Sequence, residues 1–110
     1  MWAEMSTFKD REKSYEAKYA HDQETVFKIN ARRNKLLGAW VAEQLGLAGA
    51  DAEAYAKQVV VADFDEPGDE DVFRKVWGDL QAKGVDVSEH RVRKQMGDLL
   101  ETARQQVTSE

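Results

Sequence analysis

The 110-residue sequence has no cysteine, a single proline and no long hydrophobic run. Without cysteine the chain cannot form a disulfide, a zinc–thiolate site or a cysteine nucleophile. No run approaches the ~18 consecutive apolar residues of a membrane-spanning helix, so we expect no direct membrane insertion. The stretch that most resembles a secretory signal, residues 32–50, is interrupted by Glu43 and Gln44 and lies far from the first residue. We therefore expect a cytoplasmic protein.

The balance of charge excludes a second class of protein. The net charge is −5, and it is unevenly spread, with +2 on residues 1–35 and −7 on residues 36–110. A nucleic-acid-binding domain would show a basic face, whereas most of this chain is acidic. We expect no nucleic-acid partner.

Residues that could carry catalysis or hold a metal are few. The two histidines, His21 and His90, are far apart in sequence. Residues 63–74 match only the first part of a calcium-binding loop, because Arg74 stands where that loop requires a bidentate glutamate. The sequence contains no glycine-rich phosphate loop and no nucleophile–histidine set. We expect a protein that is not an enzyme and that has no metal and no cofactor.

Apolar side chains recur at intervals of three and four residues nearly everywhere, which predicts an all-α fold. Four such segments with short connections predict a small four-helix bundle. The expected inner faces are Val26, Ile29, Leu36, Leu37, Trp40, Val41 and Leu45; then Tyr55, Ala56, Val59, Val60 and Phe64; then Val72, Phe73, Val76, Trp77 and Leu80; and last Val92, Met96, Leu99, Ala103 and Val107.

Glycines and capping residues predict where these helices begin and end. Glycine ends a helix because it adopts the left-handed conformation without steric cost, and a short polar side chain favours a helix start. Asp86 and Glu89 have the spacing of a capping box. The expected limits are Ser6 or Thr7 to about Gly46, with a bend permitted between His21 and Thr25; Asp51 to the turn at 65–68; Asp69 to Gly84; and Asp86 onward.

The segment TFKDREKSYEAKYAHDQETVFK, residues 7–28, is unusual for a helix of so small a domain. It is rich in helix formers, but a helix in a small domain normally offers its core a wide apolar stripe. Here, at 100° per residue, Phe8, Tyr15 and Tyr19 form only one narrow seam. Either this seam packs against the bundle, or the segment binds a groove on another protein.

A basic cluster, ARRNK, occupies residues 31–35. Its cations Arg32, Arg33 and Lys35 form either a solvated face beside the apolar stripe or a site for an acidic partner or a phosphate. The second interpretation predicts an alternative function, that of a stand-alone regulatory or adaptor bundle that binds a nucleotide or another anion at this cluster.

Several stretches resemble the zeta-type ATPase inhibitor subunit of alphaproteobacterial F-type ATP synthases. They are TFKDREKSYEAKYAHD, FKINARRNKLLGAW, EAYAKQVVVADFDEPGDEDVFRKV and the closing helix, so that the resemblance runs from about Met5 to Leu100. It implies a small four-helix bundle with a mobile or weakly packed N-terminal helical segment. Residues 1–22 would be this inhibitory segment and residues 23–110 the bundle.

The resemblance also implies how the protein acts. The inhibitory segment would enter a catalytic interface between the alpha and beta subunits, contact the gamma subunit and block rotation in the hydrolytic direction, while largely sparing synthesis. The protein would be associated with the inner membrane only peripherally, through the synthase. Carried onto this chain, the anchors would be Phe8, Arg11, Tyr15 and Tyr19, and the polar contacts Glu12, Glu16, Lys18 and Asp22.

Overall fold

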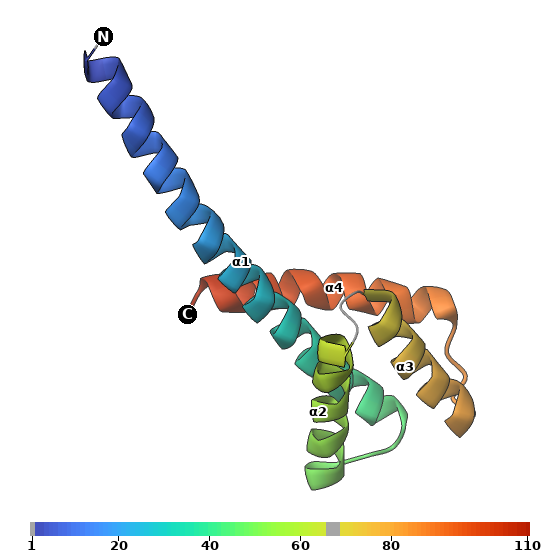
Figure 1. The fold of residues 1–110 in the computed structure, drawn as a ribbon. Coiled ribbons are helices and arrows are strands. Elements are labelled where there is room, and N and C mark those ends of the chain that lie inside the picture. The colour runs from blue at the N-terminus through green and yellow to red at the C-terminus, as the bar shows by residue number, and fades with distance from the viewer. Residues whose placement is uncertain (1, 66–68) are drawn as a thin grey trace.

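The fold consists of four helices (Figure 1). The computed structural model describes the backbone of residues 2–65 and 69–110 and the side chains of residues 23–63 and 69–110. The helices are α1 (Trp2–Gln44), α2 (Gly49–Asp65), α3 (Asp69–Lys83) and α4 (Glu89–Thr108). Within these two backbone ranges there is no strand, so the predicted all-α, four-helix fold is confirmed.

Helix α1 determines the outline of the molecule. It is 43 residues long, begins earlier than predicted, and continues through the stretch where the sequence permitted a bend. Its second half packs against the other three helices, whereas its first half projects beyond them (Figure 1). The molecule consequently measures 68 × 26 × 23 Å. We call residues 2–22 of α1 the arm and residues 23–110 the body.

Two glycines end helices where the sequence predicted that they would. Gly46 follows α1 with a φ of 78°, and Gly84 follows α3 with a φ of 75°. In this left-handed conformation the chain turns back, and the Leu47 amide donates to the Ala42 carbonyl over 2.9 Å. The helix ends are therefore determined locally, by the conformational freedom of glycine.

Two predicted helix starts were wrong by two to three residues. Helix α2 begins at Gly49, so Asp51 lies in its first turn instead of capping it. Helix α4 is capped by Ser88 and not by Asp86, because Ser88 directly precedes the helix in an extended conformation. Its hydroxyl accepts a hydrogen bond from the Arg91 amide over 3.0 Å, which satisfies one of the free amides of the first turn.

The core lies between the second half of α1 and the other three helices. Most of the predicted inner-face residues are buried or half-buried, and each fully buried aliphatic side chain contributes about 1.5–3 kcal/mol. Val26 is an error of the prediction, because its side chain is 54% exposed at the edge of the body. Phe64 lies outside the described side chains. The fully buried hydrophobic side chains with the largest volumes are Leu37, Val41, Val59, Val72, Val76, Leu80 and Val92.

Candidate functional site

The arm carries the residues that the sequence assigned to a partner. Its backbone is one continuous helix with the rest of α1, and none of the other three described helices lies beside it (Figure 1). The seam of Phe8, Tyr15 and Tyr19 stays a prediction from their spacing along the sequence. All the side chains predicted to contact a partner lie outside the described side chains; they are Phe8, Arg11, Glu12, Tyr15, Glu16, Lys18, Tyr19 and Asp22.

The base of the arm is joined to the C-terminal end of α4. Arg32 on α1 donates to the Gln106 side-chain oxygen over 2.9 Å and forms an ion pair with Glu110. One helical turn before Arg32, Lys28 pairs with Glu24 over 3.6 Å. The two contacts of Arg32 join α1 to α4, whereas the Lys28–Glu24 pair lies within α1. We infer that the contacts of Arg32 fix the direction in which the arm projects.

The predicted basic cluster does not form one site in the structure. Arg33 is 1% exposed, and its guanidinium donates to Asp69 over 2.8 Å and to Asn34 over 2.7 Å. Arg32 is held by α4, and Lys35 is exposed on the surface. The three cations thus have three different surroundings. Anion binding at this cluster stays a prediction, and Lys35 is the exposed cation that it would use.

The ion pair between Arg33 and Asp69 ties α1 to the start of α3. Asp69 lies in the first turn of α3, where the positive end of the helix dipole also favours a carboxylate. A buried guanidinium needs such a partner because an unpaired charge inside a protein is very costly. The sequence predicted Asp69 as a helix start but could not show that it neutralises a buried arginine.

A second polar contact joins α2 to α3. The Tyr55 hydroxyl donates to the Asp79 carboxylate over 2.7 Å, and Lys75 binds the same carboxylate over 2.8 Å. The Lys75 ammonium also lies 5.3 Å from the centre of the Tyr55 ring. Burial, and then the hydrogen bond to Asp79, raise the pKa of Tyr55 far above its ordinary value, so the ring stays neutral. The sequence identified Tyr55 only as a core residue.

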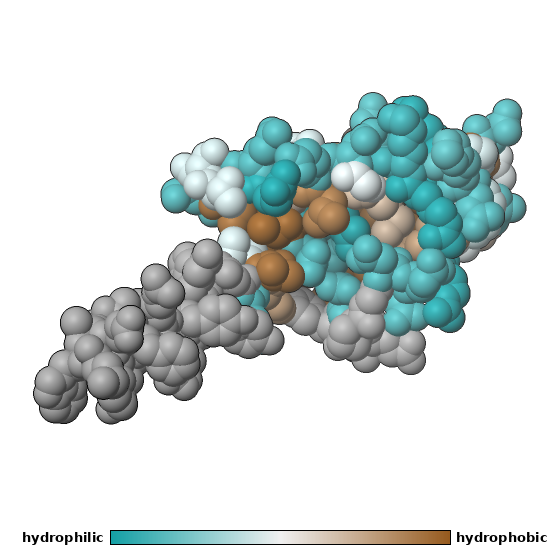
Figure 2. Space-filling model, turned by 90° about the horizontal axis from the view of Figure 1, so that it is seen from above, coloured by the Kyte–Doolittle hydropathy of each residue, from teal (hydrophilic) through white to brown (hydrophobic). Residues whose placement is uncertain are grey.

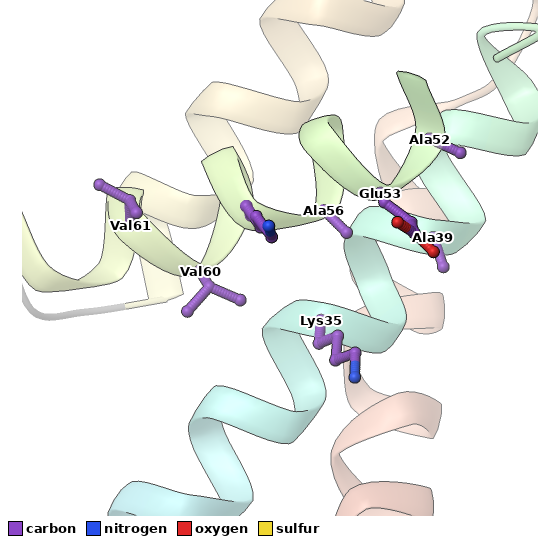
Figure 3. A pocket seen from close by; sticks show the side chains of 8 residues that line it. Lys35, Ala39, Ala52, Glu53, Ala56, Val60 and Val61 are labelled. Atoms are coloured by element: carbon purple, nitrogen blue, oxygen red, sulfur yellow. The ribbon is translucent and has the colours of Figure 1, made fainter. Parts of the chain in front are cut away.

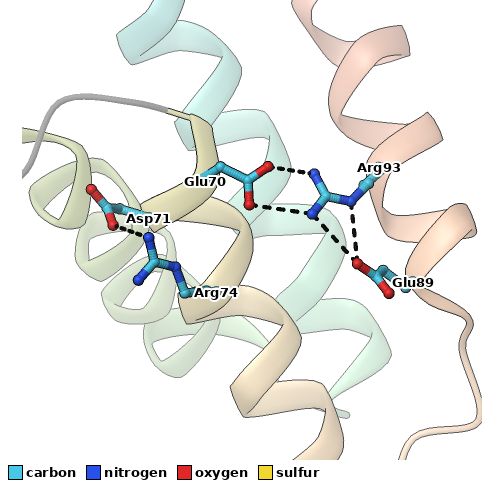
Figure 4. A network of polar contacts seen from close by, with 5 residues as sticks. All are labelled: Glu70, Asp71, Arg74, Glu89 and Arg93. Atoms are coloured by element: carbon cyan, nitrogen blue, oxygen red, sulfur yellow. Dashed lines mark hydrogen bonds and ion pairs between the residues drawn. The ribbon is translucent and has the colours of Figure 1, made fainter.

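A third polar contact joins α3 to α4, and Figure 4 shows it. The two terminal nitrogens of Arg93 on α4 bind the Glu70 carboxylate on α3 over 2.8 and 3.3 Å, and Arg93 also reaches Glu89 over 3.4 Å. Its guanidinium carbon lies 3.9 Å from the centre of the Phe73 ring. The hydrogen bond and charge of Arg93 lower the pKa of Glu70 below its ordinary value. Each helix of the body is thereby linked to a neighbour by a polar contact.

Neither a metal-binding cluster nor a membrane-spanning helix is found in the part of the chain that the structure describes. His90 is exposed, and the side chain of His21 is not among those described. Among the described residues, no three of the types His, Asp and Glu lie close enough together to hold a metal ion. A membrane-crossing length of apolar residues was likewise not found in any helix of the described ranges.

Comparison with known proteins identifies the family. A profile described as ATPase inhibitor subunit zeta matches residues 5–106. The chain belongs to this family. The match begins at Met5, where the predicted resemblance begins, and it covers both the arm and the body. The chain is therefore an inhibitor subunit of an F-type ATP synthase, and it binds that enzyme.

A solved structure is similar to this chain in sequence and in fold. A protein studied by solution NMR is 52% identical to this inhibitor, with a TM-score of 0.67. The alignment covers 76% of this chain and 94% of that one. No curated protein matches the chain significantly.

Proposed function

We propose that the arm is the inhibitory element and that the body holds it. In this proposal the arm enters a catalytic interface between the alpha and beta subunits of the synthase, contacts the gamma subunit, and stops rotation in the hydrolytic direction. Rotation in the direction of synthesis is largely spared. The observation that supports this is the projection of half of α1 beyond the body, as a helix with none of the other three described helices beside it (Figure 1).

The seam on the arm supplies attraction of the right size for a reversible inhibitor. Three aromatic side chains that each bury ~150–250 Å² would gain on the order of 12 kcal/mol before any cost is subtracted. Association and the ordering of a helix together cost a comparable ~6–20 kcal/mol. The seam alone should therefore bind weakly, and the body would have to add contacts for a tight complex.

The remaining parts of the proposal concern where the inhibitor acts. We place it in the cytoplasm of an alphaproteobacterial cell, held at the inner membrane only through the synthase. There it would prevent loss of ATP when the proton gradient fails. Its role would be mechanical, with Phe8, Arg11, Tyr15 and Tyr19 as anchors and with Glu12, Glu16, Lys18 and Asp22 as polar contacts.

The seam is tested by the double substitution Tyr15→Ala and Tyr19→Ala. Because truncation of a central aromatic side chain at an interface typically costs ~2 kcal/mol or more, we expect the concentration for half inhibition of ATP hydrolysis to rise about 100-fold or more. The matched control is Asp10→Ala with Lys13→Ala, which removes two side chains at positions on the opposite side of the helix, in the turn before Tyr15. We expect this control to change inhibition by less than about threefold.

Deletion of residues 1–20 separates the two parts of the protein. The shortened chain should melt at nearly the same temperature as the full chain, because its core is in the body, and it should no longer inhibit. A shortened chain that inhibits as well as the full chain would show that the arm is not the inhibitory element.

A further inference from the structure

An apolar groove runs between α1 and α2 on the surface of the body (Figure 3). It has a volume of about 500 Å³ and is lined by small aliphatic side chains, among them Ala39, Ala56 and Val60. The groove exists because alanines occupy both helices at this level, and alanine fills little of the space between two helix surfaces. Val61, at its edge, is 53% exposed although it is hydrophobic.

The groove is continuous with a second hollow at the base of the arm. This hollow has a volume of about 330 Å³, lies between α1, α2 and the end of α4, and shares Lys35 and Val60 with the groove. Phe27 and Val107 contribute apolar surface to it. Hydrophobic side chains are also open to solvent on the face of the body seen in Figure 2. Together the two hollows form an apolar strip, which we define by Phe27, Val60, Val61 and Val107.

Lysines flank this strip, and two of them lack a partner of opposite charge. Among the described side chains, neither Lys35 nor Lys57 forms an ion pair, although Glu53 lies one turn before Lys57 on α2. Of the other four lysines of the body, Lys28, Lys75 and Lys94 form ion pairs with a residue four positions away on the same helix, and Lys83, which lies away from the strip, forms none among the described side chains. Unpaired cations beside an apolar groove of an acidic body form a surface that complements apolar side chains flanked by carboxylates.

We propose that this strip binds an amphipathic helix of the synthase whose apolar side is bordered by acidic side chains. The proposal rests on the proposed function, since it takes the synthase as the partner. It adds the contact that the arm needs, because a second attachment on the same molecule makes insertion of the arm effectively intramolecular. A second copy of the chain fits less well, since two copies meeting through this strip would bring their unpaired lysines together.

Photo-crosslinking from the groove identifies what occupies it. The chain has no cysteine, so Val61→Cys provides a single attachment point for a benzophenone probe. The matched control is Gln81→Cys, an exposed position on α3 away from the groove. With the full chain bound to the purified synthase, we expect the probe at position 61 to crosslink a carboxylate-bearing helical segment of one synthase subunit, and the probe at position 81 to crosslink it far less.

Charge reversal tests the chemistry of the groove. Lys35→Glu with Lys57→Glu should raise the concentration for half inhibition about tenfold, because attraction across the rim of the interface becomes repulsion. The control is Lys83→Glu with Lys94→Glu, which changes the net charge by the same amount on α3 and α4. We expect it to change the concentration for half inhibition by less than about twofold. All four lysines are exposed, and the melting temperature of each variant verifies that it folds.

Each outcome decides for or against the strip. The proposal is overturned if the probe at position 61 crosslinks nothing on the synthase, crosslinks a second copy of the chain, or reaches a segment without carboxylates. If position 61 crosslinks the synthase but charge reversal leaves inhibition unchanged, the proposal that the partner helix is bordered by acidic side chains is wrong. The arm is judged separately: if Tyr15→Ala with Tyr19→Ala inhibits like the unaltered chain while the crosslink at position 61 persists, the strip stands and the proposed function of the arm fails.

Discussion

Gly38 on α1 lies in close contact with Ala56 on α2, and its lack of a side chain permits this approach. A Cβ added there would lie 2.6 Å from the Ala56 Cα and 3.1 Å from the Ala56 Cβ. Real Cβ atoms do not approach a backbone atom so closely, and a backbone atom of a packed helix cannot move aside by rotating about a bond. The two helices would have to move apart, although both carry core side chains beside this contact.

Gly38→Ala should therefore destabilise the protein. We expect the free energy of unfolding to fall by about 1–3 kcal/mol, as is typical of overpacking, even though alanine favours an isolated helix by ~1 kcal/mol. Urea unfolding measures the change. The matched control is Gly97→Ala on α4, where an added Cβ would meet nothing within 4 Å. That variant should be as stable as the original or more stable, and equal effects of the two substitutions would contradict the role of Gly38.

At the scale of helices, the body is held together by polar contacts as well as by its core. Arg33 joins α1 to α3, Tyr55 joins α2 to α3, and Arg93 joins α3 to α4. The contact of Arg93 combines a two-nitrogen pair with Glu70 and a position over the Phe73 ring, a geometry that lysine cannot reproduce. We expect this contact to make stability depend on pH.

The sign of this dependence follows from the lowered pKa of Glu70. A carboxyl group whose pKa is lower in the folded protein than in the unfolded chain stabilises the fold at pH values above its unfolded pKa of ~4.3. This stabilisation is lost as the pH falls through the pKa of the folded state. Arg93→Gln removes the cause of the shift. We expect the urea midpoint to fall less between pH ~6 and pH ~3 in this variant than in the original.

The control for Arg93 is Lys94→Gln on the same helix. Lys94 pairs with Asp98 within α4 over 3.0 Å, so its loss breaks no contact between helices. It should leave the slope of stability against pH close to that of the original. If Arg93→Gln and Lys94→Gln have the same slope, Arg93 does not link α3 to α4 in the way proposed.

At the scale of the whole molecule, α1 belongs to two environments. Its second half is packed among the other helices, and its first half extends beyond them (Figure 1). A helix that packs against nothing gains little stability in water, because most helical stability in proteins comes from packing. The arm should thus gain its full order where it is bound, while the core keeps the rest of α1 helical at all times.

Amide hydrogen exchange of the free protein measures this difference. We expect the amides of residues 8–22 to exchange at least ~100-fold faster than those of Leu37 and Val41, because local opening of an unpacked helix costs little free energy. Slow exchange along the whole of α1, equal to that of the core, would contradict the division into arm and body. Addition of the synthase should then slow exchange in the arm.

Local sequence patterns predicted most of the fold and part of the site. The four helices, their inner faces and the glycines that end α1 and α3 depend on residues close in sequence, so spacing and conformational preference were enough. The prediction failed at Val26, because periodicity indicates which side of a helix is apolar but not how far along that side another helix packs. It also failed at Asp86, because several residues before a helix can cap it and only the backbone decides which one does.

The tertiary structure alone decided how the charges and the small residues act. In the sequence Arg32, Arg33 and Lys35 are equivalent cations, yet Arg33 is buried against Asp69, Arg32 is held by α4 and Lys35 borders the groove. Which of these occurs depends on helices that are distant in sequence. The seam and the family could be read from the sequence itself, since both depend on the order of residues along one helix. The projection of the arm, the contact at Gly38 and the apolar strip arise only when the four helices pack together.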